Sequence, residues 1–375
     1  MNRIIQRILL FLFLIINVLF VDKYASRITE YHWFVSLTYL IVGALIVWIV
    51  IKKLMSSIHA SKWLMVIGLS FLLLAIVLQY FVDPLSLQVD RWSAIHNFLN
   101  GMLAGEYPYG QQTHLGGYGS PFPVWQVFHL PFYFLGNVGL SIFVVVLAFI
   151  GTLYYIYSNK VALMATILLV ISPAFWYEIV VRSDLITNIM LMAVLVEWLS
   201  YKRIKLGDYP GLVGILSGLV LSTRLIALIP ICVLYGYEFL RVDWRKQCVF
   251  LLTTILTAVT TFLPFLFWEG STLLFFEYNP FVLQTRQGSW IVLFVFAMIA
   301  IAMTIYLKEN KTYRNAFTGM ILNVLVVMAF VEKMWQQNLW DALYSSAFDI
   351  TYLTIGLPFY IAHLSCDLGK NRTYP

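Results

Sequence analysis

A chain that is otherwise almost continuously apolar is interrupted at residues 83–123, which read DPLSLQVDRWSAIHNFLNGMLAGEYPYGQQTHLGGYGSPFP. Hydrophobic residues make up 61% of the 375 residues, charged residues only 11%, and the mean hydropathy is +0.84. A soluble domain would carry about 25% charged residues. We therefore predict an all-α integral membrane protein, in which residues 83–123 form a loop between two membrane helices.

Apolar windows that are long enough, or nearly long enough, to cross a bilayer recur along the whole chain. A helix needs about 20 apolar residues for this. Twelve such windows cover residues 8–21, 34–51, 63–82, 138–157, 161–181, 185–199, 211–223, 225–240, 249–267, 290–307, 316–331 and 350–364. The sequence therefore predicts a polytopic bundle of about 12 transmembrane helices. Residues 211–223 and 225–240 could also form one long helix that is broken at Arg224.

The distribution of charge predicts how these helices are oriented. If the N-terminus, with Arg3 and Arg7, is cytoplasmic and every window crosses, most of the 24 basic residues lie in cytoplasmic loops. Acidic residues such as Asp83, Asp90 and Asp184 then lie outside. We therefore predict a multi-pass protein with both termini in the cytoplasm and residues 83–123 on the external face. The net charge of +6 reflects this topology and does not indicate nucleic acid as a partner.

The first half of the external loop has the pattern of an amphipathic helix. From Val89 onward apolar residues recur at helical spacing, which predicts a short helix in the membrane plane, anchored by Trp92. Asp90 would lie in its first turn, where the helix dipole favours an ionised carboxylate. In the alternative interpretation, Asp90 only caps the helix or balances the charge of Arg91. Asp83 directly ends the preceding helix before Pro84, a position where an aspartate is often only a terminator.

The loop also carries a family resemblance. Asp90 is followed by Gly105-Glu106-Tyr107-Pro108-Tyr109 and by Pro-Phe-Pro at 121–123. In this order and spacing the loop resembles the first external loop of GT-C superfamily glycosyltransferases, and it is most similar to the bacterial, mannosyltransferase-like branch that uses polyprenyl-phosphate sugars. The resemblance covers roughly residues 64–359 and rests mainly on residues 90–123. It implies two added N-terminal transmembrane helices in residues 1–62 and a GT-C-like catalytic module in residues 63–375.

The resemblance implies an inverting hexosyltransferase in a bacterial cytoplasmic membrane. The donor would be a polyprenyl-phosphate-linked monosaccharide, and the acceptor a lipid-linked or glycan hydroxyl on the external face. Such a transfer needs a carboxylate that takes the acceptor proton and cations that stabilise the leaving lipid phosphate. Asp90 matches the position of the family's aspartate, with Asp83 as its rival and Asp184 as a secondary acid.

Three arginines are candidates for the donor phosphate, in the order Arg224, Arg286 and Arg182. Arg224 could instead reach toward lipid headgroups. Arg182 could pair with Glu178, which lies four residues before it. Aromatic and polar side chains suit a sugar or acceptor, although Trp and Tyr are also common in any membrane interface. The candidates for sugar or acceptor binding are Tyr107, Tyr109, Trp92, His96 and Trp340.

No metal site is predicted, because His96, His114 and His129 are irregularly spaced and the three cysteines lack metal-like spacing. A divalent metal ion stays an open alternative as a cofactor. Two other functions also remain open. A transporter or flippase of a lipid-linked sugar would show internal repeats and charges at the bilayer midplane. A polysaccharide polymerase or ligase would carry a large basic loop late in the chain, whereas the longest loop here is early and contains acids.

Overall fold

The computed structural model describes residues 2–49, 59–274, 278–286, 288–308, 310, 312–345 and 348–369. Every named element within these residues is a helix, which confirms the predicted all-α class. Eight of these helices are long and apolar enough to cross a membrane, judged by length and composition. They are α1 (Asn2–Ala25), α2 (His32–Ile49), α3 (Ala60–Phe81), α7 (Ser141–Ile156) together with η4 (Val138–Leu140), α10 (Asp184–Tyr201), α13 (Trp244–Leu266), α15 (Trp290–Leu307) and α16 (Arg314–Gln336).

The remaining predicted windows coincide with shorter or bent helices. Helices α8 (Asn159–Val170) and α9 (Pro173–Val180) would form a ninth span, but they meet at an angle of 74°. The break is local, because Ser172 caps α9 by accepting the Phe175 amide at 3.2 Å and Pro173 begins it. Two further stretches, α11 (Pro210–Leu221) and η5 (Leu225–Ala227) with α12 (Leu228–Phe239), are apolar but short. The 13-residue α18 (Leu357–Gly369) follows η6 (Ile350–Gly356).

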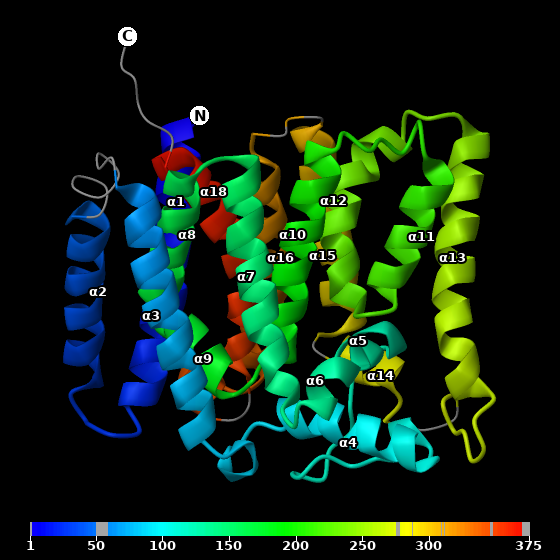
Figure 1. The fold of residues 1–375 in the computed structure, drawn as a ribbon, viewed down its shortest axis with the longest axis horizontal. Coiled ribbons are helices and arrows are strands. Elements are labelled where there is room, and N and C mark those ends of the chain that lie inside the picture. Colours follow the sequence, from blue (N-terminus) through cyan, green and yellow to red (C-terminus); the bar gives the residue numbers. More distant parts are fainter. Residues whose placement is uncertain are drawn as a thin grey trace.

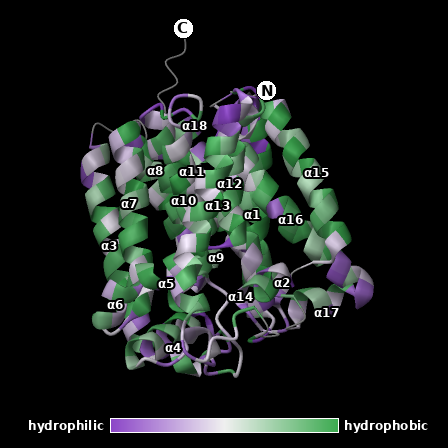
Figure 2. Ribbon diagram, turned by 90° about the vertical axis from the view of Figure 1, so that its right-hand side faces the viewer, coloured by the Kyte–Doolittle hydropathy of each residue, from purple (hydrophilic) through white to green (hydrophobic). Residues whose placement is uncertain are grey.

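The long helices stand side by side as a bundle, and the connecting segments gather at its two ends (Figure 1). Helix α1 begins and α18 ends at the same end of the bundle. Helix α4 (Arg91–Ala104), which covers most of the predicted loop helix, lies across the opposite end. The short helices α5 (Pro123–Phe128), α6 (Leu130–Phe134), α14 (Pro280–Thr285) and α17 (Leu339–Tyr344) lie at that end too. Hydrophobic residues fill the middle of the bundle and hydrophilic ones collect toward its ends (Figure 2).

Burial separates a central helix from peripheral ones. In α10, 72% of the residues in its apolar window are buried, whereas the figure is 17% for α13 and 6% for α15. Helix α15 therefore presents apolar side chains outward on almost every side, as a helix in contact with lipid does. Helix α10 is buried over most of its length, as a helix in the protein core is. Its first residue, Asp184, belongs to the site described below.

Two glycines allow α11, the helix before the Arg224 turn, to pack closely against α13. Helix α11 packs so closely against α13 that a Cβ atom at Gly214 would lie 1.9 Å from the Thr253 hydroxyl. At Gly218 a Cβ atom would lie 2.6 Å from the Thr254 carbonyl oxygen. Small residues four apart allow two membrane helices to approach in this way. Helix α11 then ends directly before the Thr223-Arg224 turn.

Helix α1 is part of the bundle core. Leu9, Phe13 and Phe20 are at most 2% exposed, and α1 packs against α9 and α18. At its last turn, the Lys23 ammonium donates to the carbonyl oxygens of Ser345 at 3.1 Å and Phe348 at 3.4 Å. The domain boundary at residue 62 stays a prediction, but α1 is structurally continuous with the helices that follow that boundary.

Candidate functional site

A cavity of about 720 Å³ opens near α4, at the end of the bundle away from the chain termini. Its walls come from the last turn of α1, the loop before α4, the start of α10, the Arg224 turn and the segment before η6. Among the described residues, seven charged side chains line it: the acids Asp90, Asp184 and Asp349 and the bases Lys23, Arg27, Arg91 and Arg224. Three of these, Asp90, Asp184 and Arg224, are predicted site residues, which the fold brings together from three separate segments.

Among the described residues, Asp90 is the carboxylate in this cavity that has no ionic partner. It precedes the first residue of α4, but its side chain makes no capping hydrogen bond. One carboxylate oxygen, Oδ2, accepts a hydrogen bond from the Thr113 hydroxyl at 2.9 Å. Both alternative interpretations of Asp90 therefore disagree with the structure, because it neither caps α4 through its side chain nor pairs with Arg91. A half-buried carboxylate that lines a cavity, with no ionic partner among the described residues, can accept a proton from a molecule bound there.

The Gly-Gly-Tyr-Gly run at 116–119 fits closely under this carboxylate. Thr113 and Gly117 form a tight turn, in which the Thr113 amide donates to the Gly117 carbonyl at 2.8 Å and the Gly117 amide to the Thr113 hydroxyl at 3.0 Å. A Cβ atom at Gly117 would lie 3.0 Å from Oδ2 of Asp90. The glycine at 117 therefore provides space for the carboxylate of Asp90.

Replacing Gly117 by alanine should displace the Asp90 carboxylate. We expect the rate of any reaction that uses this carboxylate to fall about 10- to 100-fold, since a small misplacement of a reacting group has an effect of this order. The melting temperature in detergent should change little. Gly151→Ala is the control, because a Cβ atom at Gly151 meets nothing within 4 Å. An unchanged rate for Gly117→Ala would show that the position of Asp90 does not matter.

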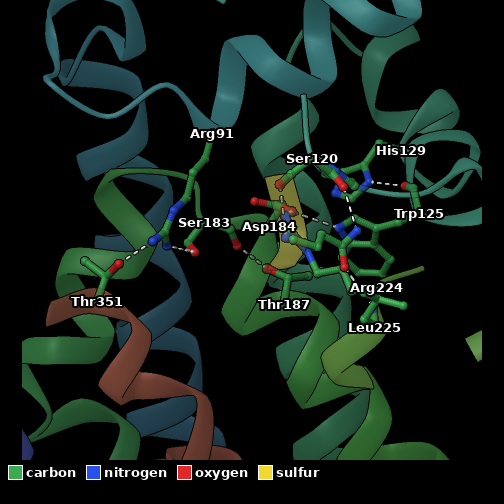
Figure 3. Close-up of polar contacts among 12 residues, drawn as sticks. Arg91, Ser120, Trp125, His129, Ser183, Asp184, Thr187, Arg224, Leu225 and Thr351 are labelled. Carbon is green, nitrogen blue, oxygen red and sulfur yellow. Dashed lines mark hydrogen bonds and ion pairs between the residues drawn. The ribbon is translucent and has the colours of Figure 1, made fainter. Parts of the chain in front are cut away.

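Asp184 and Arg224 form a buried ion pair at the floor of the cavity (Figure 3). Asp184, the first residue of α10, is 3% exposed and also accepts a hydrogen bond from the Trp125 indole at 3.2 Å. Arg224 is 8% exposed, and its Nη1 donates to the Ser120 hydroxyl at 3.4 Å. Its Nε has no hydrogen-bond partner in the part of the chain that the structure describes. Asp184 thus holds the guanidinium in place and leaves one of its donors unused.

The predicted Pro-Phe-Pro segment packs against the turn that carries Arg224. The Phe122 amide donates to the Thr223 carbonyl and the Val124 amide to the Ser222 carbonyl, both at 3.0 Å. The Gln284 amide group donates to the Ser120 carbonyl at 2.6 Å and accepts from the Leu225 amide at 2.7 Å. Two motifs that lie about a hundred residues apart in the sequence therefore form one unit around Arg224.

Arg91 is the centre of a second polar cluster, next to the Asp184–Arg224 pair. The sequence did not predict this role of Arg91. Its guanidinium donates to Glu178 at 3.1 Å, to the Ser183 hydroxyl at 2.7 Å, to Asp349 at 3.0 Å and to Thr351. Burial opposes its charge, but the two carboxylates raise its pKa above the usual value. Because Ser183 and Asp184 are adjacent, the two arginines lie on either side of the start of α10 (Figure 3). Arg91 thus fixes α4, with Asp90 at its N-terminus, to α9 and η6.

Arg182 lies outside the main cavity, and it does not pair with Glu178. Its guanidinium donates to the carbonyl oxygens of Gln79 and, at 2.8 Å, Val82. Arg182, Asp83 and Trp92 line a separate recess of about 410 Å³. Asp83 caps η2 (Pro84–Ser86) by accepting the Leu85 amide at 2.9 Å, which fits its interpretation as a terminator. The structure therefore places Asp90, rather than Asp83, in the larger cavity.

The five predicted sugar- or acceptor-binding residues do not line this cavity. Tyr109 is buried, its hydroxyl donates to the Pro121 carbonyl at 3.2 Å, and Tyr107 packs beside it. Trp92 stacks on His96 with ring centroids 4.4 Å apart, and Trp340 is 67% exposed and stacks on Tyr344. The aromatic residues that do line the cavity are Tyr24, Tyr118, Tyr177, Phe348 and Tyr352. Of these, Tyr118 lies within residues 83–123, the loop on which the sequence analysis concentrated.

Arg286 does not line the cavity but lies next to a residue of its outer surroundings, Tyr278. It follows α14, is exposed, and its guanidinium lies 4.9 Å above the Tyr278 ring. Tyr278 in turn stacks on Tyr118 with ring centroids 5.5 Å apart. Arg286 is therefore connected to the cavity wall through two tyrosine rings.

An apolar groove of about 250 Å³ adjoins the cavity at Arg224. The two share Ser120, Leu185, Arg224, Phe348 and Tyr352 as lining residues. The rest of the groove is almost entirely apolar and comes from η5, α12, α14, α15 and α16, with Ile226, Ile229, Leu283, Leu293, Phe296, Leu325, Val326 and Ala329. Arg224 thus lies where a charged, polar space meets a hydrocarbon-lined one.

His129 lies behind the Asp184–Arg224 pair and is held neutral. It is 1% exposed, and its Nδ1 donates to the Trp125 carbonyl at 2.7 Å (Figure 3). Burial lowers the pKa of His129 to about 4, from an ordinary value of 6.5, although the Trp125 carbonyl and the nearby Asp184 oppose this effect.

This lowered pKa predicts a loss of stability in acid. Between pH 6.5 and pH 4 the unfolded chain binds a proton at His129 that the folded protein does not. The free energy of unfolding should therefore decrease as the pH falls through this window, by up to about 3 kcal/mol. Melting temperatures from pH 7 to pH 4.5 should fall more steeply for the wild type than for His129→Gln. Parallel curves for the two proteins would contradict the prediction.

Among the described residues, no three His, Cys, Asp or Glu side chains lie close enough to hold a metal ion. His114 is instead engaged with the Ser93 hydroxyl at 2.7 Å and the Leu87 carbonyl at 3.0 Å. In comparisons with known proteins, no family model, no curated protein and no solved structure matches this chain. Any proposal of a function therefore depends on the geometry of the site.

Proposed function

We propose that this protein is a GT-C-like, inverting glycosyltransferase that moves a monosaccharide from a polyprenyl-phosphate donor to a lipid-linked or glycan hydroxyl. The observation that carries the proposal is the junction at Arg224. There a polar cavity with an unpaired carboxylate meets a groove lined by hydrocarbon side chains. A polyprenyl-phosphate sugar has the matching chemistry, because a polar sugar and a hydrocarbon chain are joined by one phosphate.

In this proposal Arg224 binds the donor phosphate. Its guanidinium is held by Asp184, and its Nε is buried with no hydrogen-bond partner within the described ranges. A fixed guanidinium is well suited to phosphate oxygens. The isoprenoid chain lies in the groove between α12, α15 and α16, and the sugar extends into the cavity toward Asp90. Asp184 then serves mainly to position Arg224, and Arg286 and Arg182 are less suited to the phosphate because they lie outside both spaces.

Asp90 is the general base of the proposed transfer. As the acceptor oxygen forms its bond to the anomeric carbon, the bond from that carbon to the phosphate oxygen breaks. The acceptor proton passes to the Asp90 carboxylate, and the leaving polyprenyl phosphate keeps the electron pair beside Arg224. Attack from the side opposite the phosphate inverts the anomeric centre. A positioned base and a fixed cation are the two elements that such a step requires.

We also propose that all twelve predicted windows cross a bacterial cytoplasmic membrane. This topology requires the bent pair α8–α9, the short helices α11 and α12, and η6 with α18 to cross in addition to the eight long helices. The described lysines and arginines at 62, 160, 202, 203, 205, 241, 245, 246, 308 and 314 all lie near helix ends at the end of the bundle where α1 begins. The positive-inside rule makes that end cytoplasmic and the α4 end external.

The alternatives are less well supported by the described residues. A flippase needs a polar path between the two faces, but along α10 Ile186, Ile189, Ala193 and Val196 are at most 1% exposed and belong to the apolar core. A polymerase or ligase would be expected to bind its polymer with a large basic loop, and the described loops at the α4 end combine basic and acidic residues.

The test is transfer by the purified protein in lipid nanodiscs. A set of polyprenyl-phosphate monosaccharides, each labelled in the sugar, is supplied with a lipid extract as the source of acceptors. We expect one of these donors to be consumed with release of polyprenyl phosphate and appearance of the label in an acceptor. Movement of intact donor between the leaflets without cleavage would support the flippase instead.

A further inference from the structure

A second cavity, of about 540 Å³, lies at the opposite end of the bundle from Asp90. It is formed where α10, α12 and α15 end and α16 begins. Among the described residues, four cations line it, Arg203, Lys205, Lys308 and Arg314, together with one carboxylate, Glu238. The Glu238 Oε1 accepts the Gly207 amide at 2.9 Å. Because the described cations outnumber this carboxylate, the described lining of the cavity carries a net positive charge.

The buried member of this group has unused donors. Arg314 is 5% exposed, and its Nη2 donates to Glu197 at 2.9 Å. Its Nε and Nη1 are buried and have no hydrogen-bond partner among the described residues. Unsatisfied buried donors are costly, and in a cavity they indicate a missing acceptor. Arg314 is also the first residue of α16, whose N-terminus lacks a side-chain cap, so the helix dipole adds positive potential at the same point.

We propose that this cavity binds the phosphate headgroup of an anionic phospholipid from the leaflet on that side. The phosphate accepts hydrogen bonds from Arg314, and Lys205 and Lys308 neutralise its charge at the rim. A lipid fits better than a free anion because the cavity also has hydrocarbon walls, formed by Leu199, Val233, Leu234 and Leu307. Basic pockets between membrane helices commonly hold such headgroups. The proposal is independent of the transferase proposal, because the two cavities share no residue.

Native mass spectrometry of the delipidated protein tests this site by titration with phosphatidylglycerol. We expect one lipid to bind tightly to the wild type. The double variant Lys205→Gln/Lys308→Gln removes two exposed cations and leaves the buried Arg314–Glu197 pair intact. It should bind about 30-fold more weakly, as expected for the loss of two cations near a lipid phosphate. The control, Lys62→Gln/Arg245→Gln, removes the same charge at the same end outside the cavity and should keep wild-type affinity.

Two further arms separate lipid from free phosphate. Lipid that stays bound in the presence of excess inorganic phosphate supports the proposal, as does weaker binding of phosphatidylcholine. The proposal is overturned if the wild type retains no lipid, if inorganic phosphate displaces the lipid, or if both double variants weaken binding equally. The last result would mean that the charge of the whole surface, rather than this cavity, attracts the lipid.

Discussion

Replacing Asp90 by asparagine is expected to lower the transfer rate by about 100- to 10,000-fold, the range typical for loss of a general base. The amide has nearly the shape of the carboxylate but cannot take up the acceptor proton. Since the Asp90 side chain neither caps α4 nor forms an ion pair, the change should leave folding almost unaffected. Initial rates with the donor identified above, together with melting temperatures in detergent, measure both effects.

The matched control is Asp83→Asn. Asp83 lies seven residues earlier in the same loop and carries the same charge, but it lines the separate recess and only caps η2. Asparagine can accept the Leu85 amide as aspartate does, so this change should leave both the stability and the rate near those of the wild type. If Asp83→Asn abolished transfer while Asp90→Asn remained active, the roles of the two aspartates would have to be exchanged.

Breaking the ion pair between Arg224 and Asp184 should have the largest effect on stability. Each of these side chains is at least nine-tenths buried, so Arg224→Met leaves the Asp184 carboxylate without its partner in an apolar environment. Loss of one member of a buried pair commonly reduces the free energy of unfolding by about 3–5 kcal/mol. Reversible unfolding in mixed micelles should show a decrease of this size for Arg224→Met.

The double variant Arg224→Met/Asp184→Leu separates stability from function. Replacing a buried pair by apolar side chains of similar size is often neutral for stability, so the double variant should recover most of the loss. Its transfer rate should stay as low as that of the single variant, because the donor phosphate still lacks its cation. Recovery of transfer along with stability would show that Arg224 has only a structural role.

Composition and hydropathy were sufficient to predict the class of the fold. An all-helical membrane protein follows from a chain with 11% charged residues, and the predicted loop helix coincides with most of α4. The number of crossings was harder to predict, because α11 and α18 are only 12 and 13 residues long. Hydropathy cannot tell a short spanning helix from a short buried one.

Three predicted site residues, Asp90, Asp184 and Arg224, line one cavity, but the sequence did not predict the contacts that support them. Asp90 precedes α4, Asp184 begins α10, and Arg224 lies between α11 and η5, and such positions at helix ends can be predicted from one sequence. The partners of Arg91 cannot, since Glu178 and Asp349 lie 87 and 258 residues away. Contacts of this kind depend on how the helices pack. For the same reason aromatic motifs did not indicate which rings line the cavity, and the binding roles of Tyr107, Tyr109, Trp92, His96 and Trp340 stay predictions.

The most direct test of the account is to map where the donor's hydrocarbon chain binds. A polyprenyl phosphate with a photoreactive diazirine in its second isoprene unit is bound in nanodiscs, activated by light, and the labelled peptides are identified by mass spectrometry. We expect label on the groove, in peptides that contain Ile229, Phe296 or Leu325. This label should be lost when unlabelled polyprenyl phosphate competes, or in the double variant Arg224→Met/Asp184→Leu. Label that spreads over lipid-facing residues of α3, α13 and α15 without competition would contradict this expectation.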